Sequence, residues 1–320
     1  MNGMLADAVM FLNKHAELLN FPGLNPSYVV ADANRSTLEP AFFSYEDEIN
    51  AYFHPFHKCL IPQTDYYEII SAYGYGGPVA TSEDPIFIKK VLENYRLWCE
   101  QEDIVVETIR FHPLINNWRY YYGDVTTVRN TVCVDLASNN LLGSYSTRVR
   151  TAIKKAIKNG VVIKLASPEE FLAIFPGLYY ELMKKINAKE NYFFNHSYFK
   201  GIFNLENAFR LLAFLDNEII GGAIFFIQHK TLEYHLSASN DIGKQLCATN
   251  LLLHEAFIYA QKMGCQFAHL GGGVTSASDD PLLFFKLGFA GRLIPFKLGR
   301  FIHNSTIYEA LLRKGLLLAR

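Results

Sequence analysis

Residues 267–289 carry the most distinctive set of chemically useful residues in this 320-residue chain. A short apolar strand ends in three glycines and is followed by a polar loop and a helix with one lysine, Lys286. Asp279 or Asp280 can cap this helix at Pro281, because proline in the first helical position loses no hydrogen bond. The glycines permit positive φ and close approach of a ligand to the backbone; they are Gly271, Gly272 and Gly273. The combination is typical of a site for an anionic or polar ligand, although it also suits a tight connection with a solvated lysine.

A second group of polar residues follows a predicted strand in the first half of the chain. Residues 104–111, IVVETIRF, have the composition of a strand and lead into His112. Because side chains alternate along a strand, Arg110 and His112 point to the same side and would enter a cleft there together. The glycine cluster at residues 73–78, YGYGGP, is predicted to be a turn, and Tyr75 could form the lip of a ligand site beside it.

Residues 139–160 predict a basic helix that stops at Gly160. Its broad polar face carries five cationic side chains: Arg148, Arg150, Lys154, Lys155 and Lys158. Such a face is either solvated or a docking site for the phosphate groups of a nucleotide, a lipid-linked pyrophosphate or a tRNA end.

The elements that position these residues occur in two similar series. A helix over residues 86–101 precedes the strand at 104–111, and a helix over residues 246–263 precedes the strand at 266–270. The two series lie about 160 positions apart, which indicates an internal repeat. We therefore predict an α/β (α+β) fold in two domains, residues 1–138 and residues 139–320, the second with the main motif cluster.

The net charge narrows the class of binding partner, and the cysteine content narrows the cellular compartment. The formal net charge of -1 provides no overall attraction to DNA, RNA or anionic lipid, so any nucleic-acid contact would use a local patch. The five cysteines are scattered and form no CxxC pair, which favours a reducing compartment. Neither a signal peptide nor a transmembrane span is predicted. We expect a cytoplasmic protein with at most peripheral membrane contact.

A metal site is a weak alternative. His54, His57 and Cys59 are close in sequence, but they fall in a predicted strand rather than in a metal-binding spacing. We expect no metal site and no metal cofactor in this chain.

Several motifs follow one another in a specific order from about residue 66 onward. They are YGYGGP (73–78), ETIRFHPLINN (107–117), RVRTAIKKAIKNGVVI (148–163), NAKENYFF (187–194), YHLSAS (234–239), ATNLLLHEA (248–256), HLGGG (269–273) and FFKLGF (284–289). Their order resembles the Fem family of aminoacyl transferases and its FemAB-type relatives in the GNAT superfamily. The resemblance implies two tandem GNAT-like domains, each a mixed, largely antiparallel sheet flanked by helices.

The resemblance also implies acyl transfer to an amine without a covalent enzyme intermediate. This reaction needs a neutral amine and positive charge or hydrogen-bond donors where the oxyanion develops. Lys286 matches the family's lysine in its FK-x-x-F segment and would contact the donor or the oxyanion. His235, in YHLSAS, would take the amine proton, although a histidine in an aromatic strand is more often a core residue. Asp280 would orient Lys286 or cap its helix, and the cap is favoured.

The same resemblance implies how substrate is held. Arg110, His112 and Tyr75 would hold the acceptor or its phosphate, and Tyr192 would form a wall of the cleft.

The donor stays open between two classes. A GNAT enzyme holds the pyrophosphate of CoA on a glycine-rich turn, whereas residues 242–250, IGKQLCATN, contain only Gly243. The near-neutral charge nevertheless favours acyl-CoA, such as acetyl-CoA, with transfer to an amine of a cell-envelope precursor or of a nucleotide-linked or lipid-linked sugar. The first alternative is an aminoacyl-tRNA-dependent transferase that adds an amino acid to a peptidoglycan precursor or peptide. The second is a non-catalytic scaffold with the same fold.

Overall fold

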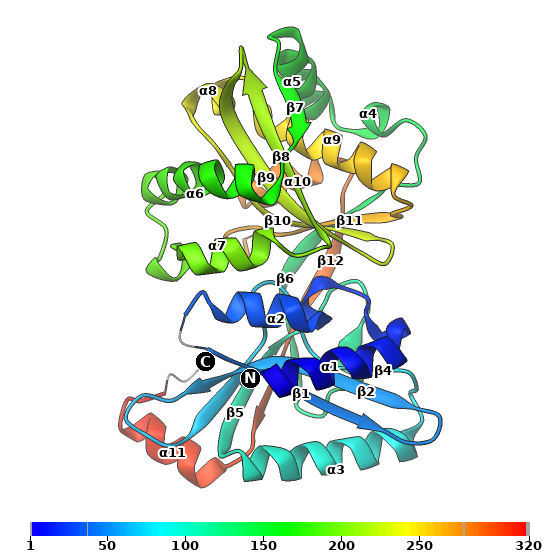
Figure 1. Ribbon diagram of the computed structural model, residues 1–320, viewed down its shortest axis with the longest axis vertical. Coiled ribbons are helices and arrows are strands. Elements are labelled where there is room, and N and C mark those ends of the chain that lie inside the picture. The colour runs from blue at the N-terminus through cyan, green and yellow to red at the C-terminus, as the bar shows by residue number, and fades with distance from the viewer. Residues whose placement is uncertain (1, 37, 278, 318–320) are drawn as a thin grey trace. The chain divides into compact units, whose positions relative to one another are not determined.

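The computed structural model describes residues 2–36, 38–277 and 279–317. It forms two compact units, one of Met1–Arg129 with Pro295–Arg320 and one of Asn130–Ile294 (Figure 1). Within the described residues, every helix is too short or too polar to cross a membrane.

The first unit is built on a mixed sheet in the order β1-β2-β3-β5-β12, with the short β4 beside β2. The pairings are antiparallel except for β3 with β5, which run parallel. The strands are β1 (Glu39–Glu46), β2 (Ala51–Leu60), β3 (Tyr67–Ile70), β4 (Val79–Ala80), β5 (Ile104–Arg110) and β12 (Arg292–Ile302). The helices are α1 (Asn2–Lys14), α2 (Pro26–Ala33), α3 (Pro85–Gln101) and α11 (Ser305–Arg313), with 3-10 turns at Ala16–Leu18, Pro22–Leu24 and Asn117–Tyr120.

Helices cover both faces of this sheet. Asp84 caps α3 by accepting a hydrogen bond from the Ile86 N–H, and Pro85 takes the first helical position. The buried side of α3, Phe87, Val91, Tyr95 and Cys99, packs on one face of the sheet. On the other face, Leu12 of α1 packs in a cluster with Phe53 of β2. Figure 1 shows α3 on one side of this sheet and α1 and α2 on the other.

The second unit contains a sheet of the same kind in the order β6-β11-β10-β9-β8-β7. Only β10 and β11 are parallel; the other pairs are antiparallel. The strands are β6 (Asp124–Asp135), β7 (Val162–Leu165), β8 (Ala208–Leu215), β9 (Glu218–Gln228), β10 (Thr231–Ser239) and β11 (Phe267–Gly272). The helices are α4 (Leu141–Ser144), α5 (Thr147–Lys158), α6 (Pro168–Lys185), α7 (His196–Phe203), α8 (Asp241–Gln245), α9 (Ala248–Lys262) and α10 (Pro281–Leu287), with a 3-10 turn at Glu190–Tyr192.

This sheet, too, is covered on both faces. Ser167 caps α6 by accepting a hydrogen bond from the Glu170 N–H, and residues 167–170, Ser-Pro-Glu-Glu, have the sequence pattern of a capping box. Phe171 and Phe175 of α6 lie over Gly222, where a Cβ would be 3.2 and 3.1 Å from their rings. On the opposite face α5 and α9 share a core with β8, β9 and β11. The prediction of mixed, largely antiparallel sheets flanked by helices is confirmed.

The two compact units do not follow the division that the sequence predicts at Ser138. Val132 to Asp135 of β6 pair with β11, so residues 130–138 lie in the second unit. Leu298 to Ile302 of β12 pair with β5, so the C-terminal segment lies in the first. Strands β6 and β12 thus each begin in one unit and end in the other. The division into residues 1–138 and 139–320 stays a prediction about the sequence repeat.

One predicted helix is interrupted. The basic segment at residues 139–160 forms α4 and α5, separated at Tyr145 and Ser146. Tyr145 is buried, and its hydroxyl forms a 3.2 Å hydrogen bond with His254 Nδ1. Burial of this tyrosine turns the chain between the two helices.

Candidate functional site

Strands β10 and β11 part at their carboxyl ends. They pair only from Thr231 to Glu233 with Phe267 to His269, whereas β10 continues to Ser239 and β11 to Gly272. Each strand also changes register against its other neighbour near this point, β10 between Tyr234 and Leu236 and β11 between His269 and Gly271. Such irregularities redirect side chains and are frequent beside active sites. The carboxyl ends of parallel strands are the usual place for a ligand on an open α/β sheet.

The local structure explains why glycine occupies two positions at the end of β11 and just after it. Gly271 has a φ of +69°, in the left-handed region that favours glycine. At Gly273 a Cβ would lie 2.4 Å from Asp280 Oδ1, so only glycine allows the loop to close on this carboxylate. The predicted close approach at this turn is therefore to a side chain of the chain itself.

Asp280 holds this loop and the start of α10. Its Oδ1 accepts a 2.9 Å hydrogen bond from the Leu283 N–H, and its Oδ2 accepts bonds from Thr275 N and Oγ1 at 2.8 and 3.1 Å. Asp280 is thus the helix cap that the sequence analysis favoured.

Lys286 is buried at the opening between β10 and β11. It is 6% exposed, and its Nζ donates a 2.7 Å hydrogen bond to the Gly272 carbonyl. The same Nζ lies 5.7 Å from the centre of the Tyr234 ring. Burial lowers the pKa of Lys286 to about 8, although the charge of Asp280 opposes the shift. A desolvated ammonium therefore stands at the glycine-rich end of β11.

His235 has its contacts on the other face of β10. Its Nε2 is 2.8 Å from the Tyr198 hydroxyl of α7, and its ring packs edge-on against Phe226. Tyr234, the neighbour of Lys286, packs instead with the α5 and α9 core. Burial lowers the pKa of His235 to about 3 against the opposing charge of Glu233. A histidine with this pKa is a weak general base at neutral pH.

A carboxylate–imidazole pair that the sequence analysis missed lies beside His235 in the sheet. Glu233 and His269 are register partners in β10 and β11, and Oε2 of Glu233 is 2.8 Å from Nδ1 of His269. Because the carboxylate accepts, Nδ1 donates, and the neutral ring has its basic lone pair on Nε2. His269 stands in the HLGGG motif, but Glu233 is 36 positions away and has no local sequence signal.

Tyr75, Arg110 and His112 come together in the first unit. The Tyr75 ring packs edge-on against both His112 and Phe296, at 5.5 Å between ring centres in each case. The Arg110 guanidinium lies 5.5 Å from the centre of the same Phe296 ring. Among the described residues, the buried Nε of Arg110 has no hydrogen-bond partner. Tyr75 and Phe296 thus link His112 to Arg110; that these side chains bind substrate stays a prediction.

Asn117 fixes the loops around this group. Its Oδ1 accepts a 3.0 Å bond from the His112 N–H, and its Nδ2 donates a 2.9 Å bond to the Gly76 carbonyl. The Gly76 N–H in turn donates to the Arg110 carbonyl at 2.7 Å. Asn117 belongs to the quoted ETIRFHPLINN motif, but its bracing role was not predicted.

Arg148 and Tyr192, two further residues predicted to hold substrate or wall its cleft, lie in the second unit, and these roles stay predictions. The Arg148 guanidinium lies 3.9 Å from the Phe284 ring centre and donates to the Phe284 carbonyl, so it fastens α5 to α10. Tyr192 is 39% exposed, and its backbone carbonyl accepts a 3.0 Å hydrogen bond from the Tyr179 hydroxyl.

The segment where a GNAT enzyme would hold CoA pyrophosphate is closed by its own packing. Gly243 lies in α8, and a Cβ there would be 2.1 Å from the Ile220 carbonyl oxygen. This glycine is therefore required by helix–sheet packing. Helix α9 then begins after Cys247, whose φ is +60°.

Comparison with known proteins shows the fold. Neither a family model nor a curated protein sequence matches the chain. The crystal structure of FemX matches with a TM-score of 0.71 and 12% identity over 89% of this chain and 93% of that one. The C-terminal DUF2156 domain of a putative lysylphosphatidylglycerol synthetase from Agrobacterium fabrum matches with a TM-score of 0.64 and 13% identity, over 97% and 96%. L-PGS from Bacillus licheniformis matches with a TM-score of 0.61 and 13% identity, over 98% and 97%. The chain therefore shares the fold of FemX and of the L-PGS structures, in agreement with the resemblance that its ordered motifs predicted.

Proposed function

We propose that the chain is an aminoacyltransferase that moves an amino acid from aminoacyl-tRNA to an amine of a peptidoglycan precursor or peptide. The observation that carries the proposal is the buried Lys286 ammonium, held on the Gly272 carbonyl where β10 and β11 part. A desolvated cation stabilises a developing oxyanion far better than a solvated one does.

Two observations favour an aminoacyl donor over the acyl-CoA that the sequence analysis preferred. Gly243, the one glycine in the segment that would bind pyrophosphate, is used in packing against Ile220. One structure of similar fold is a domain of a putative lysylphosphatidylglycerol synthetase, a name that contains an aminoacyl group. Transfer of an aminoacyl group is thus consistent with both the fold and the packing of Gly243 in α8.

In this proposal the reaction is a direct acyl transfer. The acceptor amine attacks the carbonyl carbon of the aminoacyl ester, a C–N bond forms, and the C–O bond to the terminal ribose of tRNA breaks. Lys286 donates to the oxyanion that develops between these two events. His269, oriented by Glu233, is a better candidate than His235 to take the amine proton, because the low pKa of His235 disfavours protonation. The departing ribose oxygen takes up a proton.

The first unit would bind an anionic part of a substrate. The buried Nε of Arg110 has no hydrogen-bond partner among the described residues. Its guanidinium would therefore donate to a phosphate or carboxylate of the substrate. The rings of Tyr75 and Phe296 beside it would pack against the apolar part of that group.

The test is a transfer assay with labelled aminoacyl-tRNA and UDP-linked peptidoglycan precursors, run beside the same assay with acetyl-CoA. We expect labelled precursor from aminoacyl-tRNA alone, and a loss of about 10²–10³ in kcat for Lys286→Met. Lys262→Met, which changes an exposed lysine at the end of α9, is the matched control and should retain activity.

Two outcomes would overturn the proposal. Lys286-dependent transfer from acetyl-CoA would select the acyl-CoA function. Absence of transfer from any donor, with no thermal shift by any of them, would favour a scaffold, because a ligand that binds only the folded state raises the melting temperature.

A further inference from the structure

Three side chains with metal-binding atoms meet in the first unit, apart from the residues of the proposed transfer site. Cys99 comes from α3, Glu107 from β5, and His303 follows β12. Their ligand atoms lie within 4.8 Å of one another, and Nε2 of His303 is 3.4 Å from Oε2 of Glu107. Cys99 and Glu107 are buried, and the side chain of His303 is only 6% exposed.

The interior beside this cluster contains polar atoms without partners. Among the described residues, Glu107 Oε1 and both ring nitrogens of the fully buried His54 form no hydrogen bond. The second carboxylate oxygen, Oε2, accepts a 2.7 Å bond from the Tyr95 hydroxyl. Leaving buried polar atoms unpaired costs free energy. A cation beside Oε2 would compensate the negative charge of this buried carboxylate.

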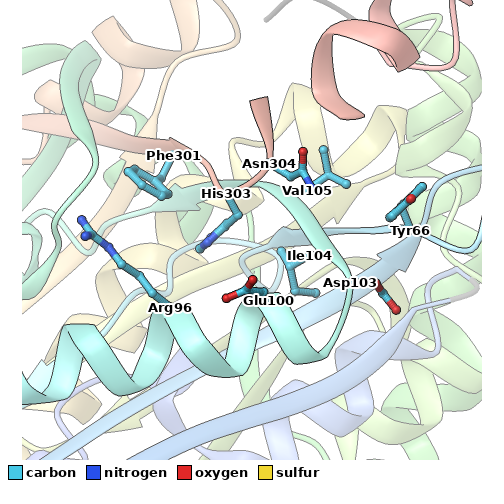
Figure 2. Close-up of a pocket in the computed structure, with 9 residues that line it drawn as sticks. All are labelled: Tyr66, Arg96, Glu100, Asp103, Ile104, Val105, Phe301, His303 and Asn304. Carbon is cyan, nitrogen blue, oxygen red and sulfur yellow. The ribbon is translucent and has the colours of Figure 1, made fainter. Parts of the chain in front are cut away.

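His303 connects the cluster to a pocket. The pocket has a volume of about 300 Å³ and is lined by Tyr66, Arg96, Glu100, Asp103, Ile104, Val105, Phe301, His303 and Asn304. Figure 2 shows the His303 imidazole between the side chains of Arg96 and Glu100. The carboxylates of Glu100 and Asp103 in this lining favour entry of a cation, and the pocket holds room for water.

We propose that Cys99, Glu107 and His303 bind a zinc ion, with water from the pocket as the fourth ligand. A thiolate, an imidazole and a carboxylate form a donor set that suits Zn²⁺, whereas Mg²⁺ and Ca²⁺ require oxygen ligands. Nitrogen and oxygen ligands on one tetrahedral zinc are about 3.3 Å apart. The 3.4 Å between His303 and Glu107 already matches this spacing.

The surrounding hydrogen bonds support the ligands. The Tyr95 hydroxyl would orient the Glu107 carboxylate, which is the usual contribution of groups around a metal site. The Tyr122 hydroxyl, now 3.2 Å from His303 Nε2, would give up this nitrogen to the metal and turn to water. Binding releases the proton of the Cys99 thiol, since the thiolate is the ligand.

The bound ion would join three elements of the first unit. Helix α3 and strand β5 are close in sequence, but His303 lies about two hundred positions from them and is brought to them by the pairing of β12 with β5. The ion would thus fasten the C-terminal segment to the rest of the unit. The proposed ligands are not the residues that the sequence analysis considered, His54, His57 and Cys59. In that group, His57 Nε2 is 2.9 Å from the Val29 carbonyl oxygen.

The test uses the full chain, stripped of metal by a chelator, and titrates it with Co²⁺ as a spectroscopic substitute for Zn²⁺. We expect one equivalent to bind, with the visible bands of a tetrahedral site and a near-ultraviolet band from thiolate-to-cobalt charge transfer. Zn²⁺ should displace the cobalt and raise the melting temperature. X-ray absorption of the zinc form should show one sulfur at about 2.3 Å and lighter ligands at about 2.0–2.1 Å.

Variants locate the site. Cys99→Ser should remove the charge-transfer band, whereas Cys133→Ser, a buried cysteine of the second unit, should retain it. Because Cys99 is in the core, His303→Gln at the pocket provides a second variant and should weaken binding at least about tenfold. The proposal is overturned by the absence of stoichiometric binding, or by a zinc spectrum without sulfur. None of these readouts uses transferase activity, so failure of the zinc proposal can be distinguished from failure of the proposed function.

Discussion

At the scale of a single residue, the burial of Lys286 in the candidate site lowers the stability of the fold. Its ammonium is 6% exposed and hydrogen-bonded to one backbone carbonyl, so folding removes it from water with little return. Its pKa of about 8 expresses this cost, because burial favours the neutral amine. The same desolvation would strengthen its interaction with an oxyanion.

The pKa of Lys286 predicts a pH-dependent stability. Between its folded value of about 8 and the ordinary 10.5, the unfolded state binds more protons, so the free energy of unfolding rises with pH. We expect wild type to gain up to about 3 kcal/mol over Lys286→Met across this interval. The measurement is urea unfolding of both proteins at several pH values from 7 to 10.5. A constant difference between them would show that Lys286 is solvated.

The short segment at residues 73–78 depends on one side-chain amide, that of Asn117 in the 3-10 turn Asn117–Tyr120. Asn117 is fully buried and bridges the His112 N–H and the Gly76 carbonyl. Asn117→Ala leaves both backbone groups without this partner, so we expect a loss of about 2–4 kcal/mol in the free energy of unfolding. Asn94→Ala, at an exposed position of α3, is the control and should change it by less than about 0.5 kcal/mol. Equal losses in the two variants would exclude a bracing role.

Elements with local signals were predictable from the sequence. The cap at Asp280 and the two helix–strand series follow from local sequence patterns, as does the cap at Ser167, and the structure contains all of them. The Glu233–His269 pair depends on the register of two parallel strands, and no local pattern encodes this register. The break at Tyr145 depends on burial against His254, more than one hundred positions away.

At the scale of the whole molecule, the first compact unit is not one continuous segment of the chain. Strand β6 leaves the first unit to pair with β11, and β12 leaves the second to pair with β5. A composition change near Ser138 could not predict this, because composition reports the boundary between repeats and not the pairing of distant strands. The predicted fold class was right because each repeat keeps its own helix and strand pattern.

This exchange predicts which unit depends on the C-terminus. Residues 295–320 supply five register pairs with β5, and Tyr308 and Leu311 of α11 pack with Val105 and Val106. A chain that ends at Ile294 should therefore lose hydrogen-exchange protection in β3 and β5, while β8 and β9 remain protected. A chain that ends at Leu317 retains β12, α11 and the two leucines that pack on this cluster, Leu316 and Leu317, and should behave as wild type. Equal loss of protection in β8 and β9 would mean that the two units unfold as one, whatever strand each supplies to the other.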